Sequence, residues 1–147
     1  MKTSLLRLWL CLGLGFGAAA AMARAQSLSV TSAEASCSAQ GGTVTIHVVL
    51  NYAGKSPTGL GLELLLPPGW SHQSTFGVNQ PEVGPQSGET GSLGWAYVAV
   101  PTDAARFSVV LSYPPGVAGE QSLVARPVFR PAPERPTEGQ KIVIAGP

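Results

Sequence analysis

Large apolar residues alternate with polar or small residues along several stretches of this chain. In the clearest of them, residues 43–52, one parity is apolar throughout and the other is mostly polar. The apolar parity consists of Val44, Ile46, Val48, Leu50 and Tyr52. Successive residues of a β-strand point to opposite faces, so this pattern predicts a strand with one buried face.

The same period of two recurs in three further stretches. Their apolar positions are Leu60, Leu62, Leu64 and Leu66; Leu93, Trp95 and Tyr97; and Phe107, Val109, Leu111 and Tyr113. Interleaved glycines and the stop at Pro67-Pro68 favour a strand over a helix for the leucine-rich stretch. Shorter strands are predicted within 27–35, 71–76, 119–130 and 141–145. Because Pro127 has no backbone N–H, we expect its strand to lie at a sheet edge or to be interrupted.

Seven or eight short strands, separated by turn residues and without a helical pattern, predict an all-β fold. The spacing is typical of a two-sheet antiparallel β-sandwich with immunoglobulin-like architecture. The chain lacks the Cys, Trp, Cys spacing of true immunoglobulin domains. Residues 77–89, rich in proline and glycine, are predicted to form the longest loop, and long loops in compact domains are often functional.

The first 25 residues have the pattern of a secretory signal peptide. Basic residues precede an apolar run over residues 8–21, and Ala23-Arg24-Ala25 is a typical cleavage site. A second possible site lies at residues 21–23. We predict a leader over 1–25 and a single domain over 26–147, secreted, periplasmic or at the cell surface. The apolar run is shorter than the roughly 20 residues of a membrane span, which favours a cleaved leader over the alternative of a retained anchor. No stable membrane span is expected once the leader is removed.

Charge and cysteine content narrow the function classes. Residues 26–147 contain six basic and eight acidic side chains, and no basic cluster of the kind that holds nucleic acid by its phosphates. Cys37 is the one cysteine outside the predicted leader. We predict a small buried apolar role for it, with intermolecular pairing or a reactive thiol as the other interpretations.

The order of the motifs resembles that of bacterial cohesin-like modules, which belong to a β-sandwich group that also holds several cellulose-binding domains. The resemblance rests on the segments Leu64-Leu65-Leu66-Pro67-Pro68-Gly69-Trp70 and Gly91-Ser92-Leu93-Gly94-Trp95-Ala96-Tyr97. It also includes residues 107–119 followed by 123–130, and it extends over roughly residues 28–144. The resemblance implies a non-catalytic extracellular role in binding or assembly.

Three aromatic residues are candidates for a ligand surface. Trp70 follows a Pro-Pro-Gly turn, where its side chain could either cover the core or contact a ligand. Trp95 and Tyr97 share a parity with Leu93, which predicts that they fill the core. They would serve as a platform for sugar rings only if they were exposed.

Metal and catalytic motifs are not evident in the sequence. Cys37, His47 and His72 match neither a zinc nor a copper spacing. Glu82, Glu89 and Asp103 are scattered acids that leave calcium binding open. We predict no metal and no cofactor.

A set of Ser108, His72 and Asp103 can be named for nucleophilic catalysis, but no Gly-x-Ser-x-Gly motif is present. The chain is therefore predicted not to be an enzyme. We expect a secreted module that mediates extracellular or cell-surface protein contacts, with polysaccharide binding as the alternative.

Overall fold

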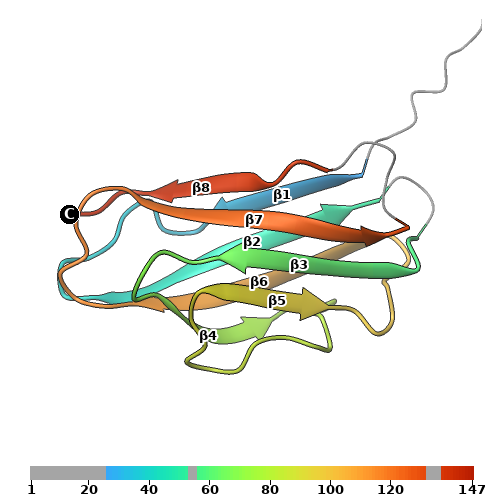
Figure 1. Ribbon diagram of the computed structural model, residues 1–147, viewed down its shortest axis with the longest axis horizontal. Helices are drawn as coiled ribbons and strands as arrows, with labels where there is room; N and C mark the ends of the chain where they lie inside the picture. Colours follow the sequence, from blue (N-terminus) through green and yellow to red (C-terminus); the bar gives the residue numbers. More distant parts are fainter. Residues whose placement is uncertain (1–25, 53–55, 132–136) are drawn as a thin grey trace, which may run out of the picture.

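The alternating segments form eight β-strands in two antiparallel sheets (Figure 1). The computed structural model describes residues 26–52, 56–131 and 137–147. The strands are β1 (Ser27–Ser32), β2 (Gly42–Asn51), β3 (Gly59–Leu65), β4 (Ser71–Phe76), β5 (Ser92–Ala96), β6 (Ala104–Tyr113), β7 (Gln121–Arg130) and β8 (Gln140–Ile144). The sheet orders are β1-β2-β6-β4 and β5-β3-β7-β8. The described residues contain no helix, and the predicted β-sandwich is confirmed.

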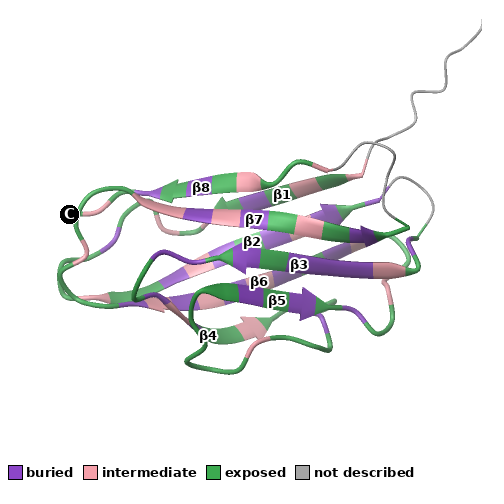
Figure 2. Cartoon of the chain, in the orientation of Figure 1, coloured by how far each residue is buried: buried purple, intermediate pink, exposed green. Residues whose placement is uncertain are grey.

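The apolar parities of the strands face one another between the two sheets. Figure 2 shows buried residues alternating with exposed or intermediate ones along β2 and β5. Leu50 of β2, Leu64 of β3 and Leu111 of β6 are completely buried, as the period of two predicts. Burial of a large apolar side chain stabilises a fold by about 1.5–3 kcal/mol, so this shared core is the main source of stability.

The strand that contains Pro127 is not an edge strand. β7 lies between β3 and β8, and Pro127 is opposite Leu62 in the β3–β7 pairing. The pairing of β8 with β7, however, extends only from Gln121 to Ala125. Pro127 therefore lies beyond the last residue of β7 that β8 pairs. The expectation of an edge strand was wrong for β7 as a whole, but the proline does occupy a position where one neighbouring strand has ended.

Backbone bonds from loops cover the outer edges of β4 and β5. Val83, from the 77–91 connection, exchanges two backbone hydrogen bonds with Ala96 of β5, at 3.1 and 2.9 Å. The N–H of His72 in β4 donates to the carbonyl of Glu89 at 2.8 Å. In Figure 1 this connection runs beneath β5 and β4. Covered edges cannot readily accept a further strand from another chain.

Candidate functional site

Trp70 is a core residue, which corrects the ligand-contact alternative. Its side chain is 0% exposed, and its ring centroid lies 5.2 Å from that of Tyr113. The preceding turn explains this position: Trp70 N–H donates to the Pro67 carbonyl at 3.2 Å, and Gly69 has a φ of 82°. Proline followed by glycine at the centre of such a turn favours the type II geometry, which here directs the indole into the core.

Trp95 and Tyr97 are also buried, at 3% and 8% exposure. Because neither ring is exposed, Trp95 and Tyr97 cannot form a platform for sugar rings. Both rings pack near Phe107, with centroids 6.3 Å from it in each case. The prediction that Leu93, Trp95 and Tyr97 face the core is thus confirmed.

A partly buried chain of hydrogen bonds connects Trp95, Thr75 and His72. Trp95 Nε1–H donates to Thr75 Oγ1 at 2.9 Å, and the same oxygen lies 2.9 Å from His72 Nε2. On the other side of the imidazole ring, Nδ1 lies 3.1 Å from the carbonyl oxygen of Gln86. A carbonyl can only accept, so Nδ1 is the donor there. His72 is buried, and its two contacts serve structure.

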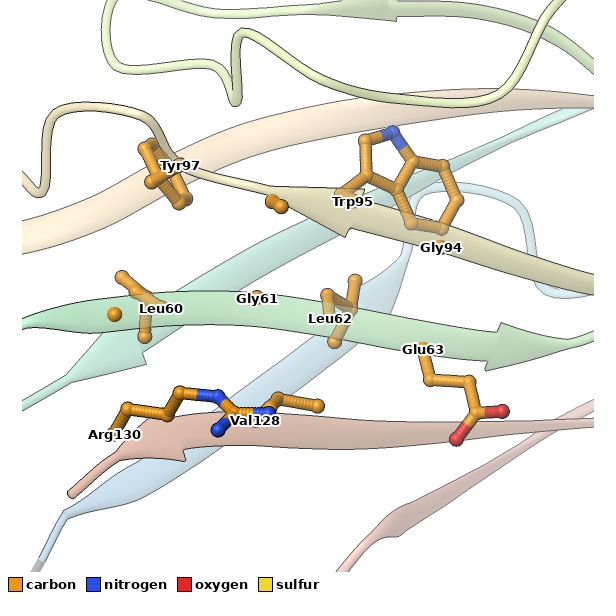
Figure 3. Close-up of a pocket in the computed structure, with 11 residues that line it drawn as sticks. Leu60, Gly61, Leu62, Glu63, Gly94, Trp95, Tyr97, Val128 and Arg130 are labelled. Atoms are coloured by element: carbon orange, nitrogen blue, oxygen red, sulfur yellow. The ribbon is translucent and has the colours of Figure 1, made fainter. Parts of the chain in front are cut away.

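A surface depression lies on the outer face of the second sheet, over β3 and β5 (Figure 3). Its volume is about 400 Å³. The outward positions of its floor carry no side chain larger than a methyl group, since they are Gly59 and Gly61 of β3 and Gly94 and Ala96 of β5. We call this depression the trough.

Strand register determines the walls of the trough. Gly61 is opposite Ala96 on one side and Val128 on the other, and Ala96 is in turn opposite Val83. Residues directly opposite one another in antiparallel pairs point to the same face of a sheet. One row across the outer face therefore reads Val83, Ala96, Gly61, Val128, with two small residues between two exposed valines.

The glycines of the floor have different physical reasons to be glycine. A Cβ on Gly61 would lie 2.6 Å from the Trp95 carbonyl oxygen, so no side chain fits there. A Cβ on Gly94 would meet nothing within 4 Å, and its φ is not in the left-handed region. Glycine inside a strand is less stable than alanine by roughly 0.5–1 kcal/mol. At Gly94 neither a steric clash nor the backbone conformation explains why the strand has glycine in place of the more stable alanine.

Charged groups border the trough at both ends. At one end Arg130 is opposite Gly59, and a Cβ on Gly59 would lie 3.2 Å from the Arg130 Cβ. At the other end Glu63 lies between Gly94 and Arg126 in register. Ser92 Oγ donates to Glu63 Oε1 at 3.0 Å. By register, Arg130 lies at one end of the uncharged floor, and Glu63 and Arg126 lie at the other.

Hydrogen bonds hold the predicted long loop beside the trough. Glu82 accepts hydrogen bonds from the backbone N–H of Val98 at 2.9 Å and of Ala99 at 3.4 Å. The Val98 bond is the main cause of a lowered Glu82 pKa. Tyr97 donates its hydroxyl to the Asn79 carbonyl. These contacts keep the Val83 wall of the trough at a fixed position.

The metal and catalytic candidates are not assembled into a site. Among the described residues no three His, Cys, Asp or Glu side chains group as metal ligands, so Glu82, Glu89 and Asp103 do not form one. Ser108 pairs with His47, whose Nδ1 lies 2.8 Å from Ser108 Oγ, whereas His72 is buried beside Thr75. The His47–Ser108 contact follows from the β2–β6 register, which sequence alone does not reveal.

Cys37 is buried, as predicted, and burial raises the pKa of its thiol. A raised pKa lowers the fraction of reactive thiolate at neutral pH. No helix in the described part of the chain has the length and apolar character to cross a membrane.

Comparison with known proteins finds solved structures of limited similarity. No protein-family model matches the chain, and no curated protein matches it. One similar solved structure is the chitin-binding domain of a hyperthermophilic chitinase from Pyrococcus furiosus, with 20% identity, a TM-score of 0.44, and coverage of 69% of this chain and 85% of that one. Another contains domains D2 and D3 of the major pilin SpaD from Corynebacterium diphtheriae, with 12% identity, a TM-score of 0.47, and coverage of 82% and 50%. The fold is established by the strand pairings of the chain itself, which form a two-sheet antiparallel β-sandwich, and the cohesin-like resemblance stays a prediction.

Proposed function

We propose that this chain is a secreted, non-catalytic binding module that contacts a partner protein through the outer face of sheet β5-β3-β7-β8. The observation that carries the proposal is the distribution of exposed apolar side chains. By register, Leu65, Val83, Val128 and Val143 all point outward on this face, and each is about half exposed. Exposed apolar side chains on one sheet face, bordered by polar groups, are a feature of protein interaction sites.

The composition of the face favours a protein over a polysaccharide. Protein interfaces combine an apolar centre with a charged rim, and here Arg126, Arg130 and Lys141 lie among the exposed aliphatic groups. Sugar rings stack on exposed aromatic faces. Among the described residues the one large aromatic side chain that is exposed is Phe76, on the other sheet.

The leader over residues 1–25 is part of this proposal and lies outside the described residues. Expression with export, followed by N-terminal sequencing, tests it. We expect a mature chain that begins at Gln26. A chain that keeps Met1 after export would contradict a cleaved leader.

The binding face is tested by comparing two matched variants in partner capture from the native secreted fraction. Leu65→Lys places a charge in the proposed face, whereas Thr31→Lys places the same charge on the outer face of the first sheet. We expect the wild type and Thr31→Lys to retain the same protein partner and Leu65→Lys to lose it. Equal capture by both variants, or clean binding of polysaccharide without any protein, would overturn the proposal.

A second candidate function is polysaccharide binding on the opposite sheet. Phe76 is 49% exposed and lies in register beside Ser108, whose hydroxyl contacts His47. An exposed ring next to two hydrogen-bonding side chains suits a single sugar unit. Affinity electrophoresis in gels with soluble glucan or chitin fragments tests it, because Phe76→Ala should abolish any retardation that the wild type shows.

A further inference from the structure

We infer that the trough binds an extended peptide segment of the partner, with small apolar side chains over Gly61, Gly94 and Ala96 and an acidic side chain beside Arg130. This inference rests on the proposed function for the face as a whole. It specifies the chemistry of the peptide segment that is bound and places the acidic side chain of that segment beside Arg130.

The glycine at position 94 indicates that a ligand occupies the space above the floor of the trough. Its position would accommodate a side chain without a clash and without backbone strain. A strand interior that retains glycine under those conditions marks a place where another backbone or a ligand approaches closely. Any larger residue at Gly94 would occupy the same volume that an approaching peptide needs.

The dimensions of the trough fit one extended chain. The floor runs along β3 from Gly59 to Glu63, which is about 13 Å at 3.3 Å per residue. Its width from Val83 to Val128 covers three strand spacings, or about 14 Å before the side chains are counted. Stacked sheets lie about 10 Å apart, so a peptide can rest on this floor as one sheet packs on another.

The charges select an acidic segment. Arg130 borders the end of the trough at Gly59. At the other end Glu63 lies opposite Arg126 in register, and its carboxylate accepts a hydrogen bond from Ser92. Among the described residues that line the trough, the positive charge is therefore at the Gly59 end, where an acidic side chain of the segment would complement Arg130.

The walls are preorganised, which lowers the entropic cost of binding. Val83 is held by two backbone bonds to Ala96, and the Val128 backbone lies within the β3–β7 pairing. A peptide that enters the trough therefore orders itself without also ordering the protein. Preorganisation of this kind raises affinity without additional contacts.

Defined peptides test the inference with the full chain labelled with ¹⁵N. The probes are three blocked hexapeptides: Glu-Val-Ala-Val-Ala-Ser, the same sequence with Lys in place of Glu, and the same sequence with Gln. Binding is followed by the amide NMR signals of Gly59, Gly61 and Gly94. We expect saturable shifts at these glycines, with the acidic peptide bound more tightly than the Lys peptide by roughly threefold or more.

Two variants separate the peptide site from fold effects. Gly94→Val should keep or raise the melting temperature and abolish the glycine shifts, because its side chain fills the trough. Arg130→Glu should reverse the order of the peptides, so that the Lys peptide binds better than the Glu peptide. The control is Thr31→Val, on the outer face of the first sheet and away from the trough, which should leave the glycine shifts unchanged.

Three results would overturn the inference. They are equal binding of the three peptides, shifts confined to other parts of the molecule, and unchanged peptide binding by Gly94→Val. Binding of chitin or glucan fragments in the trough, with none of the peptides, would also overturn it. Failure of the inference is distinguishable from failure of the proposed function, because Leu65→Lys would still abolish capture of a partner protein that binds the face outside the trough.

Discussion

The side-chain amide of Gln140 holds both backbone groups of Val30. Val30 N–H donates to Gln140 Oε1 at 2.7 Å, and Gln140 Nε2 donates to the Val30 carbonyl at 2.6 Å. Val30 belongs to β1 and Gln140 to β8, so the amide links the edges of the two sheets. It replaces the backbone partner that an edge strand lacks.

Replacement of this amide should destabilise the sandwich. Gln140→Leu leaves two half-buried backbone groups without partners, and we expect a loss of about 1–3 kcal/mol in the free energy of unfolding. Gln121→Leu is the matched control, because Gln121 makes a single exposed bond to Ala118 and should change stability by less than about 0.5 kcal/mol. Denaturant unfolding measures both variants, and equal values would contradict the role of the Gln140 link.

Removal of the Trp95 ring should be far more damaging. We expect Trp95→Ala to reduce stability by roughly 3–5 kcal/mol, the usual range for truncation of a buried large aromatic residue. Thr75→Val removes the acceptor of the indole N–H at nearly constant volume and should reduce stability by about 1–3 kcal/mol. Thermal melting tests both variants. An unchanged melting temperature for Trp95→Ala would mean that the ring is not in the core.

The loop contact of Glu82 should weaken in acid. Its pKa is lowered in the folded chain, so the stabilisation is present above the unfolded value of about 4.3 and is lost as pH falls through the lower folded value. The NMR shift of the Val98 amide reports this contact. We expect its titration midpoint below 4.3 in the wild type and in the control Glu89→Ala, and no such step in Glu82→Ala. A midpoint above 4.3 would contradict the hydrogen bonds.

Alkaline pH should destabilise the fold through Tyr97. Burial raises the pKa of its hydroxyl, so the folded state retains the proton more strongly than the unfolded chain. The stabilisation is complete below the unfolded pKa of about 10 and is lost as pH rises above it. Unfolding free energies measured from pH 8 to 11 should fall in the wild type and fall less in Tyr97→Phe. Parallel curves for the two proteins would contradict this prediction.

The sequence by itself determined the strands and the direction of most of their faces. The alternation around Ile46 and around Trp95 places each side chain on a face through local backbone geometry, and the structure confirms both. Local geometry did not decide whether the Trp70 side chain faces the core or the solvent, because a turn can direct the next side chain either way. Its burial follows from contact with Tyr113, which is 43 positions later in the chain.

Only the tertiary structure decided the trough and the location of Pro127. The residues Val83, Ala96, Gly61 and Val128 form one row because three separate pairings align them, and each pairing joins segments distant in sequence. Every one of these residues looks ordinary within its own strand or loop. A period of two assigns a residue to a face, but it carries no information about which strand lies beside it or in which register. That information resides in long-range contacts, and the candidate binding surface therefore became visible only when both sheets were assembled.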